Sequence, residues 1–146
     1  MSEATNPRQL VVFTLGTEHY ALPIQQVHEI IRYSEPRSVA SRADWVRGVI
    51  SLRGRIVPVY DLATRLGRPS ELTEHTKIVI VEAGSETAGV IVDGVEEVVT
   101  VEDEQLQDAP GTDTTLIDSI AKIETRLVVL LKPSAIFAAP DLPLAA

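Results

Sequence analysis

The amino-acid sequence predicts an all-β protein, built as a sandwich or as small barrels with a few short helices. Short apolar runs recur along the 146-residue chain, and β-branched residues dominate them. Glycine, proline and aspartate turn signals separate the runs, which is typical of a mainly antiparallel fold and not of a parallel sheet between helices. A chain of this length can bury its core as one domain or as two small intertwined subdomains.

The first elements form a predicted hairpin and an ambiguous segment. Residues 10–16 end in glycine and are followed, after two polar residues, by residues 19–23, so the two runs are expected to pair. Residues 24–31 follow a proline and carry isoleucine and valine at helical spacing, which predicts a short helix. Their high valine and isoleucine content leaves a strand possible.

A second hairpin is predicted around Arg53-Gly54, which separates the runs 46–52 and 55–62. A two-residue connection needs positive φ, which glycine adopts without steric cost. Pro58 has no N–H to donate to a neighbouring strand, so the second arm is expected to be an edge strand or to carry a bulge there. The interruption of an apolar segment by Arg53 and Arg55 suggests either a basic turn or arginines held for a partner.

The middle of the chain predicts one or two helical turns over 61–67, ended by a glycine and a nearby proline. Residues 77–83, 87–94 and 95–102 then predict a three-stranded meander with turns at Gly84-Ser85 and Asp93-Gly94.

The last part begins with an acidic, proline-containing loop over 103–115. Residues 116–124 alternate apolar and polar side chains, and 126–132 predict a strand buried on both faces. Residues 133–138 predict a short helix that begins at a proline.

Two segments, 48–59 and 89–101, share a Gly-Val-Ile start, a turn and a return strand. This similarity predicts two related halves.

Composition excludes several classes of function. The net charge of -8 argues against bulk nucleic-acid binding and against docking on an anionic membrane, and 4% aromatic residues argue against base stacking. The absence of cysteine excludes disulfides and thiolate chemistry. No secretory signal is visible, and the longest aliphatic run, 127–131, is too short to span a bilayer, so we expect a cytoplasmic protein without membrane insertion.

No catalytic or cofactor motif is visible. The sequence contains neither a phosphate-binding loop nor a nucleophile elbow. Paired metal-binding histidines are also missing, since His19, His28 and His75 are scattered along the chain. The sequence therefore predicts a binding module that is not an enzyme and holds no cofactor. An acidic stretch leaves open a ligand- or metal-binding β-barrel, although a solvated face that discourages strand pairing explains it more simply. Its members are Glu96, Glu97, Glu102, Asp103, Glu104 and Asp108.

Four spaced blocks resemble CheW, the bacterial chemotaxis coupling protein family, over residues 9–138. They are "LVVFTLGTEHYALPIQQVHEII", "RGVISLRGRIVPVYDL", "GVIVDGVEEVVTV" and "IDSIAKIETRLVVLL". The family's usual Asn-Leu-Arg-Gly is here Ser51-Leu52-Arg53-Gly54, which puts a hydroxyl in place of an amide. The resemblance implies two intertwined five-stranded SH3-like barrel subdomains, with 1–8 and 139–146 as flexible ends.

The resemblance also implies a function and partners. CheW-like adaptors couple the cytoplasmic tip of methyl-accepting chemoreceptors to the regulatory domain of the histidine kinase CheA, in arrays at the membrane and without catalysis. A scaffold of a pilus or other non-flagellar chemosensory pathway would share these motifs.

By resemblance, two sets of residues are expected at the partner surfaces. The receptor-binding residues are Val27, Glu29, Arg53, Val92, Val95 and Val98, and the kinase-binding residues are Gly48 and Gly89. From the residues alone, solvated positions are the favoured interpretation of Arg53 and Glu29, and turn or bulge geometry explains both glycines as well. With the resemblance, Arg53 is expected to project from its turn and to form forked hydrogen bonds with a receptor group.

Overall fold

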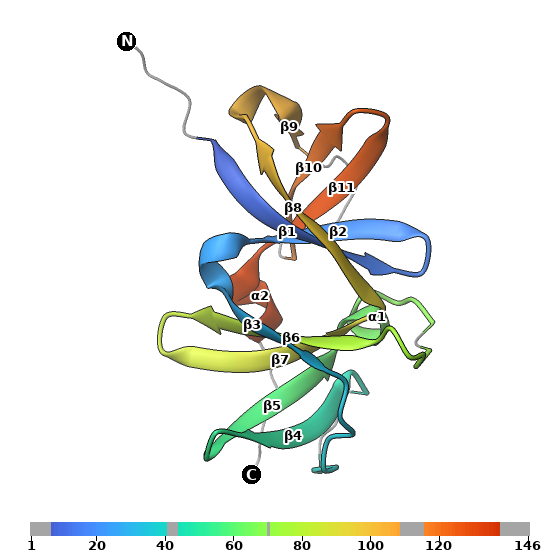
Figure 1. Ribbon diagram of the computed structural model, residues 1–146, viewed down its shortest axis with the longest axis vertical. Helices are drawn as coiled ribbons and strands as arrows, with labels where there is room; N and C mark the ends of the chain where they lie inside the picture. Colours follow the sequence, from blue (N-terminus) through green and yellow to red (C-terminus); the bar gives the residue numbers. More distant parts are fainter. Residues whose placement is uncertain (1–6, 41–43, 70, 109–115, 138–146) are drawn as a thin grey trace.

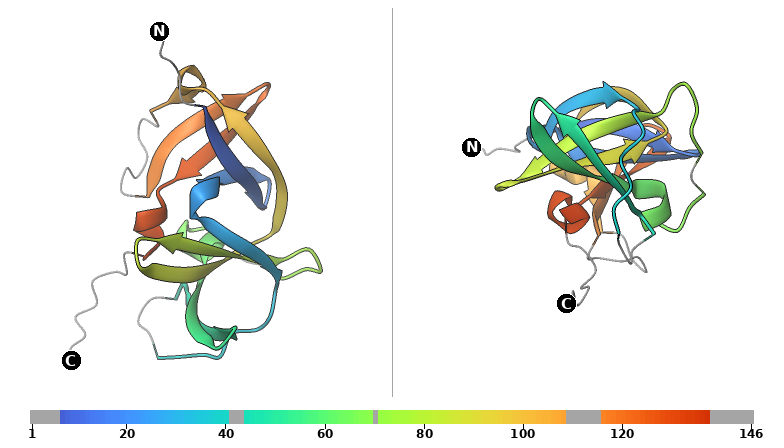
Figure 2. Two further views of the ribbon diagram at one scale, coloured as in Figure 1. Left: turned by 60° about the vertical axis from the view of Figure 1, so that its left-hand side comes forward. Right: turned by 90° about the horizontal axis from the view of Figure 1, so that it is seen from below.

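The computed structural model describes residues 7–40, 44–69, 71–108 and 116–137. Within this part of the chain, the strands form two sheets, which lie one above the other in Figure 1 and in the left view of Figure 2. We call them the first barrel and the second barrel. The expected all-β fold is confirmed.

The first barrel contains, in spatial order, β8 (Gly94–Val101), β1 (Arg8–Leu15), β2 (Glu18–Pro23), β11 (Arg126–Leu131), β10 (Ile117–Ile123) and β9 (Leu106–Gln107). The second barrel contains β3 (Val27–Arg32), β6 (Lys77–Ala83), β7 (Glu86–Val92), β5 (Arg55–Asp61) and β4 (Val46–Leu52). The two-residue strand β9 is an addition to the five strands that were expected in each barrel. β1 begins at Arg8, inside the segment expected to be a flexible end, and residues 1–6 and 139–146 lie outside the described residues.

The two barrels share one topology. In the first, β8, β1 and β2 are antiparallel neighbours, β2 pairs with β11 in parallel, and β11 pairs with β10 antiparallel. In the second, β3, β6 and β7, then β5 and β4, repeat this order and these directions. The prediction of two related halves is therefore correct, but the matched segments were wrong, since 48–59 forms β4 and β5 whereas 89–101 spans β7 and β8.

The barrels are intertwined by two strands that leave the sheet of the strand before them. β3 follows β2 in the chain but joins the second barrel, and β8 follows β7 but joins the first. The predicted three-stranded meander is thus wrong in its third strand, because Asp93 begins a crossing and not a hairpin turn. The other expected turn of the meander, between β6 and β7, is present at Gly84, whose φ is 65°.

The segment 24–31 contains a single 3-10 turn, η1 (Ile24–Gln26), and then the strand β3. The predicted helix is wrong there, and the strand alternative is correct. The short helices α1 (Leu62–Arg65) and α2 (Pro133–Phe137) lie close to their predicted places. The 3-10 turn η2 (Asp103–Gln105) lies in the segment that was predicted as a loop. Seen from below in Figure 2, α1 and α2 lie on the same side of the molecule.

Three apolar clusters form the core. One lies inside the first barrel around Leu10 and Val128, and one lies inside the second around Ile78 and Val57. The largest joins the barrels, because it combines Phe13 and Leu22 of the first with Val81, Val92 and other residues of the second. Strand alternation explains this, since one face of each sheet lines its own barrel and the other face packs on its neighbour.

Two strand predictions hold only in part. Pro58 lies on β5, which has neighbours on both sides, but β7 pairs with β5 only from Val59 onward, so the missing N–H is not needed there. β11 is buried at Val128, Leu130 and Leu131, but Leu127 is 59% exposed beside the hairpin turn. It is therefore not buried on both faces along its whole length.

Candidate functional site

The turn between β4 and β5 has the predicted two-residue geometry. Arg53 has φ 51° and Gly54 has φ 81°, and Leu52 pairs with Arg55 across the hairpin. Positive φ at both central residues defines a type I′ turn, whose twist fits the flanking strands. Arg53 thus occupies the tip of the hairpin, where 68% of its side chain is exposed.

Arg53 and Glu29 form a two-pronged ion pair. Arg53 Nη2 donates to Glu29 Oε1 at 3.0 Å, and Nη1 contacts Oε2. This hydrogen bonding lowers the pKa of Glu29 and raises that of Arg53. Arg53 was expected to project outward with its fork open, but in the free chain that fork is engaged by Glu29. The structure therefore joins two residues that the sequence could only place in separate segments.

Val27 and Glu29 lie on β3 and point to opposite faces. Val27 pairs with Val81 and Glu29 pairs with Ile80, so His28 is an extra residue in the ladder. Val27 is half-buried against the core between the barrels. Glu29 shares its face with Ile80, which lines the second barrel, and only 22% of its side chain is exposed.

The three expected valines of the second segment differ in exposure. Val98 is 52% exposed on β8, and Val95 is half-buried beside the core between the barrels. Val92 is fully buried in that core and can affect a partner surface only through the residues it supports. Val95 and Val98, together with Val27 on β3, therefore remain the apolar residues of this set that a partner can touch.

Gly48 and Gly89 both allow close internal packing. A Cβ on Gly48 would lie 1.9 Å from the carbonyl oxygen of Arg37, and its φ is 143°. Arg37 and Val49 exchange two backbone hydrogen bonds at this place, which lies beside a bulge in β4. A Cβ on Gly89 would lie 2.7 Å from Ile78 Cγ2 inside the second barrel. Their expected role in kinase binding stays a prediction, and any such role acts through this packing.

An apolar groove of about 540 Å³ lies beside the β4–β5 hairpin. It is lined by Ile31 near the end of β3, by β4 and by Ile56, which is 69% exposed. The other lining residues are Ser34, Glu35 and Arg37. Exposed aliphatic side chains in a groove between strands are typical of a protein-binding surface.

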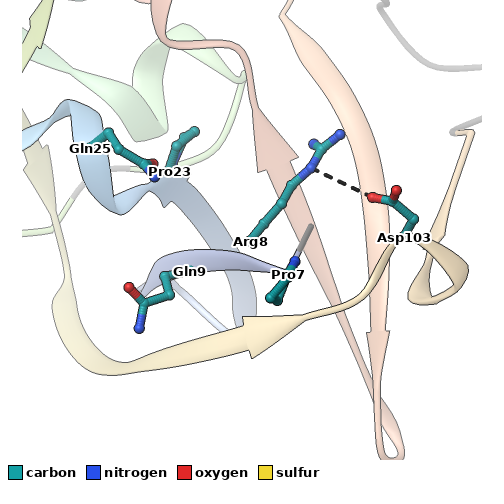
Figure 3. A pocket seen from close by; sticks show the side chains of 6 residues that line it. All are labelled: Pro7, Arg8, Gln9, Pro23, Gln25 and Asp103. Carbon is teal, nitrogen blue, oxygen red and sulfur yellow. Dashed lines mark ion pairs between the residues drawn. The ribbon is translucent and has the colours of Figure 1, made fainter. Parts of the chain in front are cut away.

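A second, polar pocket of about 330 Å³ lies at the start of β1. Figure 3 shows Arg8 and Asp103 on one side and Gln9 and Gln25 on the other. Arg8 lies 3.9 Å from Asp103, and the two amides come from β1 and η1, directly before β3. Such amides can exchange hydrogen bonds with a protein partner, but the pocket has no nucleophile positioned by a base.

Sequence reasoning missed an ion pair that fixes the base of the hairpin. Arg47 Nη2 and Nε donate to Asp61 Oδ2 at 2.7 and 3.0 Å, and Asp61 is 2% exposed. Asp61 also caps α1, since its Oδ1 accepts from Thr64 N. The position of Asp61 directly before a predicted short helix could have indicated the cap. Its pairing with Arg47 could not be predicted in this way, because it depends on how β4 and β5 pair. Trp45 is also buried, and its ring packs edge-on against Tyr60.

The acidic stretch has several separate partners. Glu96 and Glu97 contact Arg126, and Glu102 forms a capping box with Gln105. Among the described residues, no group of three metal-ligating side chains could hold an ion. In the same part of the chain, no helix is both long and apolar enough to cross a membrane.

Residues 9–141 match the CheW-like domain family. The chain is 29% identical over 142 residues to the chemotaxis protein CheW of Klebsiella aerogenes, which covers 94% of this chain and 86% of that protein. It is 33% identical over 141 residues to the chemotaxis protein CheW of Bacillus subtilis, with 92% and 90% covered. The crystal structure of the scaffolding protein TtCheW from Thermoanaerobacter tengcongensis superposes with a TM-score of 0.82 at 33% identity, covering 87% of this chain and 90% of that one.

Proposed function

We propose, starting from the fact that this chain belongs to the CheW-like family, that it is a non-catalytic chemotaxis adaptor. It couples the cytoplasmic tips of methyl-accepting chemoreceptors to the regulatory domain of the histidine kinase CheA. In this role it works in the cytoplasm, as part of receptor arrays at the membrane. The proposal rests on the family and on the surface described above, and it needs no cofactor.

The observation that carries the proposal is the joint placement of Glu29, Arg53, Val27, Val95 and Val98. Val27 on β3 and Val95 on β8 are half-buried beside the core between the barrels, and Val98 on β8 is exposed. Glu29 on β3 and Arg53 at the hairpin tip add a charged pair on the second barrel. A helical hairpin docks by laying an apolar ridge on such a surface, while charged groups at the rim fix its orientation. A receptor carboxylate could compete with Glu29 for the Arg53 guanidinium.

The direct test is co-sedimentation of the chain with a receptor tip fragment and, separately, with the kinase regulatory domain. Arg53→Glu should weaken receptor binding strongly, since it places two carboxylates together and removes the cation. Arg55→Glu is the matched control, because Arg55 lies in the same hairpin and its Nη2 donates a 3.4 Å hydrogen bond to Thr87 Oγ1. Equal receptor binding by both variants would refute the role of Arg53.

A charge exchange separates direct contact from internal positioning. The double variant Arg53→Glu with Glu29→Arg restores an ion pair of the opposite polarity. If Arg53 only positions the hairpin, the double variant should bind the receptor tip normally. If Arg53 contacts the receptor, binding should stay weak although the fold is intact. The absence of catalysis is tested independently, and nucleotide hydrolysis by the highly purified chain would contradict the proposal.

A further inference from the structure

Arg126 joins two successive carboxylates at one end of the first barrel. Its Nη1 donates to Glu96 Oε1 at 2.9 Å, and its Nη2 contacts Glu97. Glu96 also lies 3.3 Å from His19 Nε2. We call these four residues the Arg126 cluster. Only 29% of the Arg126 side chain is exposed, so this arginine is better shielded from solvent than Arg53 at the hairpin tip of the second barrel.

A bulge in β8 allows both carboxylates to face one arginine. In a regular strand, successive side chains point to opposite faces. In β8, however, Glu97 pairs with Val12 while Val95 pairs with Phe13, so Glu96 is an extra residue opposite one step of β1. An extra residue places two successive side chains on the same side. Arg126 lies on that side too, because every second residue of β11 shares a face and Val128 and Leu130 line the first barrel.

The same bulge places Val95 and Val98 on one face. Three residues apart, they would point to opposite faces of a regular strand. Here they pair with Phe13 and Val11, which are two residues apart and therefore on the same face. This is the outer face of the first barrel, which packs against the second barrel at Phe13. The exposed surface of Val98 thus exists because of the bulge.

Neighbouring strands hold the bulge from one side only. β8 ends the spatial order of its sheet, so within the described residues β1 is its only ladder partner. A shift of one residue would exchange the faces of every side chain beyond the bulge, which would turn Val98 inward. The contact of Arg126 with both Glu96 and Glu97 ties β8 to β11, from which β1 and β2 separate it in the sheet.

The second barrel repeats this construction. β3 occupies the place of β8 in the shared topology, and its extra residue is His28. Val27 then packs between the barrels, and Glu29 turns to its own barrel, where Arg53 binds it. A bulge, a glutamate two residues after a valine and an arginine from a hairpin occur together in both halves. This repetition indicates that the arginine and the bulge are connected.

We propose that Arg126 is a positioning residue for the partner surface on β8. By binding Glu96 and Glu97 together it holds the bulge, and it thereby keeps Val95 and Val98 on the same face. Arg126 itself contacts no partner. The inference rests on the proposed function, because the face that it maintains is the one assigned to the receptor tip.

The test compares Arg126→Gln with the parent chain in binding to a receptor tip fragment and to the kinase regulatory domain. Receptor affinity should fall on the order of tenfold, as expected when one aliphatic anchor leaves an interface. Kinase affinity should not change, since the residues assigned to it lie in the second barrel. Arg8→Gln is the control, because Arg8 is an exposed arginine of the same barrel with ion pairs to Asp103 and Asp118.

The register of β8 distinguishes a positioning role from a purely stabilising one, because only a positioning role requires the register to change in Arg126→Gln. Proton NMR contacts between Val11 and Val98 report the register of β8 directly. They should weaken in Arg126→Gln and return in the charge exchange Arg126→Glu with Glu97→Arg. Unchanged contacts and unchanged receptor affinity in Arg126→Gln would overturn the inference. If that variant does not fold, Glu97→Gln removes one carboxylate alone and must show the same selective loss.

Val98→Glu separates this inference from the proposed function. If Val98→Glu binds the receptor tip normally, the assigned face is wrong and the proposed function loses its surface. If Val98→Glu fails to bind while Arg126→Gln binds and keeps its register, only the positioning role is wrong.

Discussion

Replacing Val92 by alanine should destabilise the protein by about 2 kcal/mol, whereas the same change at Val98 should hardly affect stability. Val92 has no exposed surface and lies in the core between the barrels, so alanine removes two buried methyl groups at about 0.8 kcal/mol each and leaves a small cavity. Val98 is 52% exposed, so Val98→Ala should lower the free energy of unfolding by less than about 1 kcal/mol. For a chain of this size, the first change corresponds to a melting temperature lower by roughly 4–8 °C.

Thermal melts and receptor binding below the melting range provide the assay. Val98→Ala should weaken receptor binding with an almost unchanged melt. Val92→Ala should lower the melting temperature but change receptor binding little, because Val92 affects the surface only indirectly. The reasoning from exposure is refuted if both variants melt alike, or if native Val92→Ala binds the receptor tip more weakly than Val98→Ala does.

Three further outcomes follow from named contacts. Gly48→Ala should lower the free energy of unfolding by about 3 kcal/mol or more, because the added Cβ would lie 1.9 Å from the Arg37 carbonyl oxygen. Urea denaturation measures this loss, and a midpoint close to that of the parent chain would contradict it. Arg47→Met should lower the free energy of unfolding by about 2–3 kcal/mol, because it removes two hydrogen bonds from the buried Asp61. This is somewhat less than for a fully buried pair, since the Arg47 side chain is 42% exposed. Because hydrogen bonding lowers the Glu29 pKa, the ion pair contributes to stability above the unfolded pKa, and this contribution is lost as pH falls through the folded pKa. An NMR titration of the Glu29 carboxyl that is unchanged when its arginine partner becomes glutamine would disprove that.

Local features of the fold could be predicted from the sequence. The Arg53-Gly54 turn follows from the φ that a two-residue hairpin needs, and its strands are adjacent in the chain. The partner of β8 could not be predicted in the same way. β8 pairs with β1 at the other end of the chain, while the Asp93-Gly94 signal equally fits a hairpin and a crossing. Pairing over such a distance depends on the packing of the whole fold.

The bulges explain why the pattern of 24–31 was misleading. An extra residue at His28 breaks the alternation of β3, so that Val27, Ile30 and Ile31 have the i, i+3, i+4 spacing of a helix. The segment 95–99 has the same spacing around Glu96. The sequence repeat that corresponds to the shared topology is therefore "VHEII" and "VEEVV", and neither matches the alternation of a regular strand.

Four of the six expected receptor contacts lie on the two strands that exchange barrels. β3 carries Val27 and Glu29, and β8 carries Val95 and Val98. Because each strand follows one barrel in the chain and pairs within the other, a partner that touches both strands binds across the junction of the barrels. Val27 and Val95 border the same core, so a change in their packing reaches both halves through contacts that are already buried. A surface on either barrel alone would lack this direct contact with the shared core.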